Sequence, residues 1–289
     1  MLEFRIPLGD ITNYVFDQLI AFIAPVTNAI SSGLETFLNW NETFLLMWPP
    51  LLVVVILGLL VWFFVDKKLS VFIIISLIFL FGLDLWEQTM SSVGLVIAGT
   101  FLSLLFGIPI GILASQNDTA EKIVSPILDL MQTMPSFVYL IPAVIFFGLG
   151  KVAALAAILI FAIPPAIRLT NLGIRQVPTE MIEAANAFGS TRMQILKDVQ
   201  LPLAMPTIMT GVNQCIMMSL SMSVIAAMIG AGGLGREVLK AMQTVDIGLG
   251  LEGGLGIVVV AIIMDRISQK VAKRSEKERD ISNNTAGNK

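Results

Sequence analysis

The sequence predicts an all-α integral membrane protein with about seven transmembrane helices. Of its 289 residues, 56% are apolar and only 13% are charged, whereas roughly a quarter of a soluble globular protein is charged. Its mean hydropathy is +0.85. A bilayer-spanning helix needs about 20 mostly apolar residues, and the stretches that come near this length are 44–65, 69–86, 91–114, 127–149, 152–169, 203–230 and 251–266.

Composition also excludes several classes of function. The chain has no histidine, which removes Ser-His-Asp and Cys-His catalysis and histidine-ligated metal sites. Its one cysteine, Cys215, can form neither an internal disulfide nor a thiolate metal cluster. The net charge of −3 gives no overall basic surface that would attract nucleic acid. We therefore expect no metal, no catalytic residue and no nucleic-acid partner.

Residues 1–43 are predicted to form an amphipathic helix outside the cytoplasm. Acidic residues interrupt this segment, so it is neither a signal peptide nor a span. Apolar residues recur in it at helical spacing, at Ile11, Val15, Leu19, Ile23, Val26, Ile30, Leu34 and Phe37. Such a helix fits the outer membrane interface, lying flat against lipid. The alternative is a solvent-facing helix packed on a soluble partner, because both kinds of helix share this pattern.

The next two segments differ in the kind of helix they predict. Residues 44–90 contain two plain apolar runs, which we interpret as two peripheral transmembrane helices. The five later stretches, within 91–269, are rich in small residues and carry Pro109, Pro135, Pro142, Pro164, Pro165 and Pro206. Membrane helices tolerate proline and small residues where neighbouring helices pack closely. We therefore expect a packed five-helix core, followed by a charged cytoplasmic tail over 270–289.

The basic residues predict the orientation of the chain in the membrane. Seven spans place the two termini on opposite sides, and basic residues favour the cytoplasmic side. If the C-terminus is cytoplasmic, the only ones among the 18 Lys and Arg residues that lie outside are Arg5, Lys151, Arg236 and Lys240. We therefore expect a multi-pass protein of the plasma or inner membrane with its N-terminus outside.

The longest cytoplasmic loop, residues 170–202, predicts two short helices joined by a glycine turn. Thr179 is placed to N-cap a first helix that runs to about residue 188, and Gly189 supplies the left-handed residue that ends it. Thr191 and Gln194 have capping-box spacing for a second helix, which we expect to end before Pro202.

The first of these helices has the features of a docking element. A face of small and apolar residues, Met181, Ala184, Ala185 and Phe188, lies on a loop that no lipid covers. A helix lying in a groove of another protein is a common mode of recognition. A DNA-reading helix is disfavoured because the helix carries acidic residues and no basic stripe. A plain connector would not need a loop of this length, since most connections have about 2 to 8 residues.

The loop resembles the EAA signature of the membrane permease subunits of ATP-binding cassette importers. The matching residues are Glu183, Ala184, Ala185, Gly189, Leu201 and Pro202, at the spacing EAA-x3-G-x9-I-x-L-P, with Val199 in place of the usual isoleucine. A wider resemblance over about 90–270 includes PSFVYLIPAVIFFGLG and IGAGGLG, which look like the glycine betaine/proline branch of that family. The fold implied is a type I importer permease core of five helices.

The resemblance implies how the loop works and which partners it needs. Glu183, Ala184, Ala185 and Gly189 would shape a coupling helix that seats in a cytoplasmic ATPase subunit, and Leu201 and Pro202 would fix its return into the membrane. A phosphate-binding G-x-x-x-x-G-K-[ST] motif is absent from the sequence, so ATP and Mg²⁺ would sit on that partner and this chain would hold no cofactor. The other implied partners are an extracytoplasmic substrate-binding protein and a second copy of this chain.

A second candidate site is the outer segment 229–250. Gly230, Gly232, Gly233 and Gly235 permit a sharp re-entrant turn, and a short amphipathic stretch follows over 237–245. We expect this segment to form part of the outer gate and the docking surface for the binding protein. The alternative is a plain surface hairpin.

The predicted function is ATP-driven import of a compatible solute such as glycine betaine or proline betaine by alternating access. Choline, carnitine or an amino acid are alternative substrates of the same importer class. An ion-coupled carrier is a further alternative, but the middles of the core spans carry no charge, which also suits a net-neutral substrate. The aromatic residues Phe137, Tyr139, Phe146 and Phe147 could face a quaternary ammonium or simply pack, so the residues of the pathway stay unassigned.

Overall fold

The computed structural model describes the backbone of residues 8–286 and the side chains of residues 24–270. Every regular element in that part of the chain is a helix, as the sequence predicts. The elements are α1 (Leu8–Leu46), α2 (Pro50–Phe64), α3 (Lys67–Gly82), α4 (Trp86–Gln116), α5 (Asp118–Thr133), η1 (Ser136–Tyr139), α6 (Leu140–Phe147), α7 (Lys151–Arg175), α8 (Thr179–Ala187), α9 (Arg192–Gln194), η2 (Ile195–Gln200), α10 (Leu201–Ile225), η3 (Ala226–Ile229), α11 (Gly233–Thr244) and α12 (Ile247–Ala286).

The centre of the molecule is formed by α4, α7 and α10, which pack through glycine. A Cβ added at Gly107 or Gly111 of α4 would lie 2.7 Å from Ala166 Cβ or 2.6 Å from Thr170 Cβ of α7. At Gly211 of α10, an added Cβ would lie 3.0 Å from Leu169 Cβ. The four-residue spacing of small residues lets membrane helices approach closely. In α7, 67% of the apolar window is buried, more than in the other spans of the described chain.

The number of spans depends on how two bent helix pairs are treated. Among the described residues, four helices are long and apolar enough to cross a membrane alone: Trp86–Gln116, Lys151–Arg175, Arg192–Ile229 and Ile247–Lys270. The pair Ala24–Leu46 with Pro50–Phe64, and the pair Asp118–Thr133 with Ser136–Phe147, would raise this number to six. The predicted span 44–65 is shortened because residues 44–46 belong to α1, which meets α2 at 91°.

The predicted span 127–149 is not one continuous helix, because the chain bends by 109° between α5 and η1. Met134 is extended (φ −73°, ψ 138°) in front of Pro135, as expected for a residue that precedes proline. The hydroxyl of Tyr139 donates to the carbonyl of Met131 across the bend. Proline therefore breaks this helix, whereas Pro109, Pro164 and Pro165 are accommodated inside α4 and α7.

The peripheral helices α2 and α3 form a hairpin with 15 and 16 residues. At about 1.5 Å per residue each is about 23 Å long, somewhat less than the hydrocarbon thickness of about 30 Å. They contact closely at Gly58, whose carbonyl accepts from Ser70 Oγ at 2.6 Å. Asp66 caps α3 by accepting from the backbone of Lys68 and Leu69. Most apolar side chains on the far side of α2 are exposed, which fits a helix that contacts lipid.

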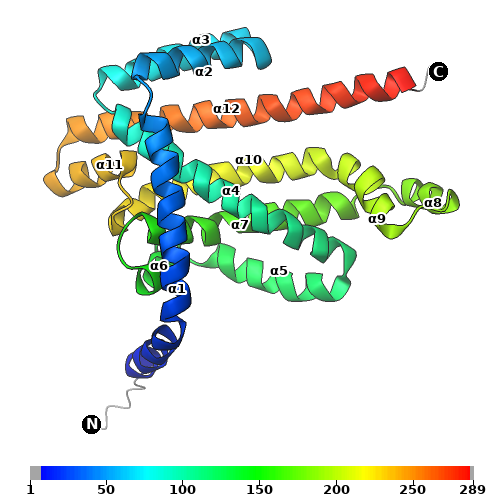
Figure 1. Ribbon diagram of the computed structural model, residues 1–289, viewed down its shortest axis with the longest axis horizontal. Coiled ribbons are helices and arrows are strands. Elements are labelled where there is room, and N and C mark those ends of the chain that lie inside the picture. Colours follow the sequence, from blue (N-terminus) through cyan, green and yellow to red (C-terminus); the bar gives the residue numbers. More distant parts are fainter. Residues whose placement is uncertain (1–7, 287–289) are drawn as a thin grey trace.

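Helix α1 crosses the other helices instead of running parallel to them (Figure 1). In its second half Leu38 is buried, and Leu34 and Phe37 pack on the same cluster. Glu42 forms an ion pair with Lys151 at the start of α7. The apolar residues predicted at positions 11, 15, 19 and 23 lie outside the described side chains. The perpendicular course is the geometry expected of an interfacial helix.

The two candidate sites lie at opposite ends of the long helices. In Figure 1, α8 and α9 lie beyond one end of the bundle, while α6 and α11 lie at the other. Helix α7 runs between these two ends. Its first residue, Lys151, contacts α1, and its last residue, Arg175, leads into the loop that contains α8. The Lys270–Asp66 ion pair (3.1 Å) joins the middle of α12 to the α2–α3 turn.

Candidate coupling loop and outer glycine segment

The predicted docking helix is formed by α8, which spans Thr179–Ala187. It has no buried residue in the isolated chain, and Glu183 and Ala184 are exposed while Ala185 is half-buried. Beside it, the side chain of Phe188 is 91% exposed. A helix that projects from the molecule with exposed apolar side chains has a free surface on which another protein can pack.

The glycine turn forms as predicted, but the helix start differs. Gly189 has φ +78°, the left-handed conformation that favours glycine, and the N–H groups of Gly189 and Ser190 close the end of α8. Thr179 is not the N-cap: the cap position is Pro178, without a side-chain hydrogen bond, and Thr179 is the first helical residue. Because Pro178 is extended (ψ 133°) and Thr179 is already helical, the helix begins one residue earlier than the cap prediction requires.

The second helix of the loop is capped as predicted but does not end before Pro202. Thr191 and Gln194 form a capping box, with the Thr191 N–H donating to Gln194 Oε1 at 2.8 Å. The chain then continues through the π-helix η2 into α10, in which Pro202 is one of the first residues. Proline lacks an N–H and is tolerated at a helix start, and π-turns locally widen a helix. The loop therefore passes into the membrane span without a break.

Leu201 and Ile195 anchor the return of the loop. Leu201 packs on a small apolar cluster formed by Ile174 at the end of α7 and by Ala204 and Ile208 of α10. Ile195 of η2 is buried. The two ends of the loop are thus held by one cluster, which supports the prediction that Leu201 positions the loop. Pro202 is exposed.

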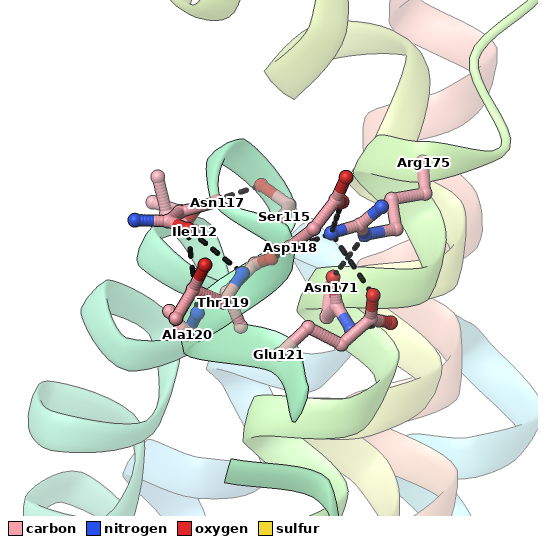
Figure 2. A network of polar contacts seen from close by, with 10 residues as sticks. Ile112, Ser115, Asn117, Asp118, Thr119, Ala120, Glu121, Asn171 and Arg175 are labelled. Atoms are coloured by element: carbon pink, nitrogen blue, oxygen red, sulfur yellow. Dashed lines mark hydrogen bonds and ion pairs between the residues drawn. The ribbon is translucent and has the colours of Figure 1, made fainter. Parts of the chain in front are cut away.

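A polar network fixes the start of the loop, and sequence reasoning did not find it. Arg175 Nη2 donates to Asp118 Oδ1 at 2.8 Å and to the carbonyl of Ala114 at 3.0 Å, and lies 3.0 Å from Glu121 Oε2. Asn171 accepts from Arg175 Nε and donates to Glu121 Oε1, each at 3.0 Å. Figure 2 shows these side chains converging from α5 and α7.

This Arg175 network joins the last turn of α7 to the turn between α4 and α5. A second contact, Gln116 Nε2 to Gln200 Oε1 at 3.0 Å, joins the end of α4 to η2. The sequence signals that could have found the network are the i, i+4 pair Asn171 and Arg175 and the acidic first turn of α5. Their meeting depends on the packing of α5 against α7, which the sequence alone does not give.

In the outer segment the glycines form the predicted sharp turn. Gly230, Gly232 and Gly233 have φ values of +90°, +79° and +67°. A Cβ on Gly233 would lie 2.3 Å from Ser92 Oγ of α4, which accepts from the N–H of Leu234 at 2.8 Å. Gly235 lies inside α11, and a Cβ there would lie 2.8 Å from the Cα of Val224. Glycine is required here for turning and for close packing.

The amphipathic stretch of the outer segment starts earlier than predicted. It is the helix α11, Gly233–Thr244, rather than 237–245. The N–H of Gly150, before α7, donates to the carbonyl of Ile229 at 2.8 Å. The segment thereby contacts the starts of both α4 and α7. Within the same segment, the side chain of Met242 is 73% exposed and that of Ile247 is 86% exposed.

The aromatic candidates for a quaternary ammonium do not share one environment. Tyr139 is 4% exposed and packs against Phe161, with ring centroids 6.1 Å apart. Phe137 is 59% exposed. Phe146 and Phe147 are half-buried. Tyr139 therefore packs in the core, and the pathway residues stay unassigned.

The family of the chain follows from its sequence over the core. Residues 107–277 match the family described as "Binding-protein-dependent transport system inner membrane component". The chain belongs to this family. Its resemblance to importer permeases, carried by the loop signature, is thus confirmed, and it is a membrane permease subunit of an ABC importer. Members of this family generally work with ATPase and substrate-binding partners.

Several relatives are similar over nearly the whole chain. The permease protein OpuAB of the glycine betaine transport system of Bacillus subtilis is 47% identical over 273 residues, covering 94% of this chain and 97% of the relative. The glycine betaine/carnitine permease GbuB of Listeria monocytogenes is 44% identical, covering 94% and 98%. The glycine betaine/proline betaine permease ProW of Escherichia coli is 42% identical, covering 93% and 76%.

Solved structures agree with the fold of this permease. A chain of the MetNI methionine ABC transporter in an inward-facing conformation superposes with a TM-score of 0.60 at 21% identity, covering 64% of this chain and 93% of the other. A second match is an amino acid ABC transporter, with a TM-score of 0.52 at 18% identity, covering 69% and 98%. The five-helix importer core predicted from the sequence is thus confirmed at the level of the fold.

Proposed function

We propose that this permease carries glycine betaine or a closely related quaternary amine into the cell, driven by ATP hydrolysed on a separate subunit. The substrate assignment rests on the 42–47% identity, over more than nine-tenths of this chain, to three permeases whose names all include glycine betaine. The uncharged middles of the core spans suit a net-neutral zwitterion, because a lone charge there is costly. Proline betaine and carnitine are the next candidates.

The coupling loop is the site at which the ATPase acts. In this proposal α8 seats in a groove of the ATPase subunit, with Glu183, Ala184 and Ala185 at the contact and Gly189 shaping its end. ATP and Mg²⁺ bind to the ATPase and not to this chain. The exposure of α8 supports this role, and so does the Arg175 network, which holds the loop to α5 and α7.

The transport cycle is alternating access in a homodimer of this chain with two ATPase subunits. Closing of the ATPase pair draws the coupling helices together, and rigid-body rotation of the cores opens the pathway to the outside. A substrate-binding protein delivers the solute at the outer face. The segment with Gly230, Gly232, Gly233 and Gly235 forms part of the outer gate and of that docking surface. Its contacts with α4 and α7 support this role.

The proposal includes an orientation with the N-terminus outside and the C-terminus in the cytoplasm. The distribution of basic residues supports it, and so does the position of α1 at the end of the bundle opposite the coupling loop. Helix α1 then lies at the outer interface in contact with lipid. The tail over 270–289 lies in the cytoplasm.

The test is uptake of radiolabelled glycine betaine into vesicles that contain this chain with its ATPase and binding protein. ATP is supplied on the ATPase side, and the proton and sodium gradients are collapsed. We expect uptake that requires ATP and that is lost in Ala184→Pro, because proline inside α8 removes a hydrogen bond and breaks the helix. Unlabelled proline betaine, carnitine, choline and methionine are added as competitors to rank the substrates.

The outcomes separate the parts of the proposal. Hydrolysis of ATP without entry of betaine would remove the substrate assignment and leave the importer class. Uptake driven only by an ion gradient would overturn the ATP-driven mechanism. Full uptake by Ala184→Pro, with the ATPase still bound, would remove the coupling role of α8.

A further inference from the structure

A polar cluster joins α10 to α12 inside the membrane-spanning part of the molecule. Asn213 Nδ2 of α10 donates to Asp265 Oδ1 of α12 at 3.1 Å. The other end of the Asn213 amide, Oδ1, accepts from Ser268 Oγ. Gln269 Nε2 lies 2.7 Å and 2.9 Å from the two carboxylate oxygens of Asp265. Both ends of the amide and both oxygens of the carboxylate therefore have partners, and all four side chains are half-buried.

The cluster joins a helix that continues from the coupling loop to a helix that is less buried. Asn213 lies in the span Arg192–Ile229, which continues directly from the coupling loop, and Asp265 lies in the span Ile247–Lys270. Only 17% of the apolar window of the second span is buried, against 44% in the first. Helix α12 is thus less buried within this chain than α10, so a specific polar contact has more effect on its position than it would in a fully buried helix.

At the outer end, the same two helices are already held close through α11. A Cβ at Gly235 of α11 would lie 2.8 Å from the Cα of Val224 in α10, and a Cβ at Gly253 of α12 would lie 3.3 Å from the N of Val238 in α11. Backbone contacts of this kind leave little freedom to slide. The Asn213–Asp265 hydrogen bond joins α12 to the middle of α10 (Leu201–Ile225), so α10 and α12 are connected at two levels, through α11 and through this bond.

We infer that Asn213 and Asp265 are positioning residues that fasten α12 to α10, so that α10, α11 and α12 move as one body when the ATPase acts on the coupling loop. The inference rests on the proposed function, because it assigns a role within the transport cycle. The outer segment lies between α10 and α12 in the chain. Because α12 is held to α10, the two helices move together when α8 moves. The outer segment is then displaced at both of its ends, instead of only at the end that follows α10.

The Lys270–Asp66 ion pair links α12 to the peripheral hairpin. Lys270 follows the cluster directly in α12, and Asp66 lies in the turn between α2 and α3. The backbone N–H of Leu69 and the Lys270 ammonium lower the pKa of Asp66, so this carboxylate is charged at neutral pH and the pair persists there. The pair adds a modest contact between the α2–α3 hairpin and α12, because both side chains are partly exposed.

The test is a charge exchange at the two positions in the full complex with its ATPase and binding protein. Asn213→Asp sets two carboxylates against each other and should lower the number of solute molecules moved per ATP hydrolysed, roughly three- to tenfold. Adding Asp265→Asn restores an amide facing a carboxylate and should recover most of the ratio. A role in folding alone would change the amount of assembled complex without changing this ratio.

Two results would overturn the inference: an unchanged ratio in Asn213→Asp, or an equal loss in the exchanged pair. If Asn213→Asp does not assemble, Asn213→Ala, Asp265→Ala and the double variant form a mutant cycle, in which we expect the double loss to be clearly smaller than the sum of the single losses. Additive losses would also overturn it. Ile262→Ala, on the exposed side of α12, is the control and should leave the ratio unchanged.

The stimulation of ATP hydrolysis by the binding protein gives a readout that does not depend on which solute is carried. It should fall in Asn213→Asp and recover in the exchanged pair. If wild-type complex moves no betaine while this pattern holds, the substrate assignment fails and the inference stands. If wild-type complex transports betaine and the pattern is absent, the inference fails alone.

Discussion

Among the glycines of the outer segment, Gly233 is the one at which an added Cβ would lie closest to another atom. It combines a left-handed φ of +67° with a distance of 2.3 Å from an added Cβ to Ser92 Oγ. Gly232 has a similar φ of +79°, but its nearest such contact, Ser91 Oγ, is at 4.0 Å. The two neighbours therefore separate backbone strain from steric overlap.

Gly232→Ala should cost about 1–3 kcal/mol, because its backbone (φ +79°, ψ −152°) lies in a region almost exclusive to glycine. Gly233→Ala should cost about 1–3 kcal/mol more, because the methyl group displaces Ser92 and its hydrogen bond to Leu234. Thermal unfolding of the purified complex measures both. Equal losses in the two variants would show that the contact with Ser92 relaxes freely. Uptake by Gly232→Ala, normalised to assembled complex, then reports on gating.

Gly189 gives a cleaner test of the coupling loop, because an added Cβ there meets nothing within 4 Å. Gly189→Val should lower uptake several-fold, since a β-branched residue is strained by about 1–2 kcal/mol at this φ and shifts the end of α8. Gly189→Asn is the matched control, because asparagine adopts the left-handed conformation readily. Similar losses in both variants would mean that the side chain itself blocks docking, and full uptake by Gly189→Val would contradict the role of the turn.

Among the elements, the coupling loop depends on neighbours that are distant in sequence. The last turn of α7 is held by Asp118 and Glu121 of α5 through Arg175, whose side chain is 31% exposed. The two carboxylates differ in environment, since the side chain of Asp118 is 79% exposed and that of Glu121 is 35% exposed. Solvent screens the first pair more strongly than the second.

Glu121→Ala should therefore destabilise the complex more than Asp118→Ala. We expect about 1–3 kcal/mol for Glu121→Ala, because Arg175 and Asn171 both lose a partner. For Asp118→Ala the expected loss is about 0.2–1 kcal/mol. Chemical denaturation of the purified complex, compared at low and high salt, measures the difference. A larger loss in Asp118→Ala would place the main anchor of the loop elsewhere.

For the molecule as a whole, the two sites lie at opposite ends of one bundle. The sole cysteine, Cys215, is fully buried at 0% exposed. New cysteines at exposed positions can therefore be labelled without background from the native chain. Phe188, beside the coupling helix, and Met242, in the outer segment, are 91% and 73% exposed.

In intact cells, a membrane-impermeant maleimide should label Met242→Cys and leave Phe188→Cys unlabelled. Phe188→Cys should become reactive once the membrane is permeabilised, although a bound ATPase lowers its reactivity. Wild-type chain is the control and should stay unlabelled in both conditions. The reverse pattern would show that the N-terminus is cytoplasmic, and labelling of both variants in intact cells would remove the separation of the two sites.

The sequence by itself determined the fold class and the local form of the candidate sites. Helical content and membrane character follow from hydropathy, and the Gly189 turn and the Thr191–Gln194 capping box follow from short-range backbone chemistry. The loop signature also gave the family, because its residues are close in sequence. What these features share is that each depends on residues a few positions apart.

Only the tertiary structure decided which prolines break a helix and which residues meet across the bundle. Pro135 bends the chain by 109° while Pro164 lies inside α7, because neighbouring helices determine whether a lost hydrogen bond is tolerated. The Arg175 network and the Asn213–Asp265 contact join residues more than 50 positions apart. Such contacts depend on how helices pack, and in this chain glycines at the crossings set that packing.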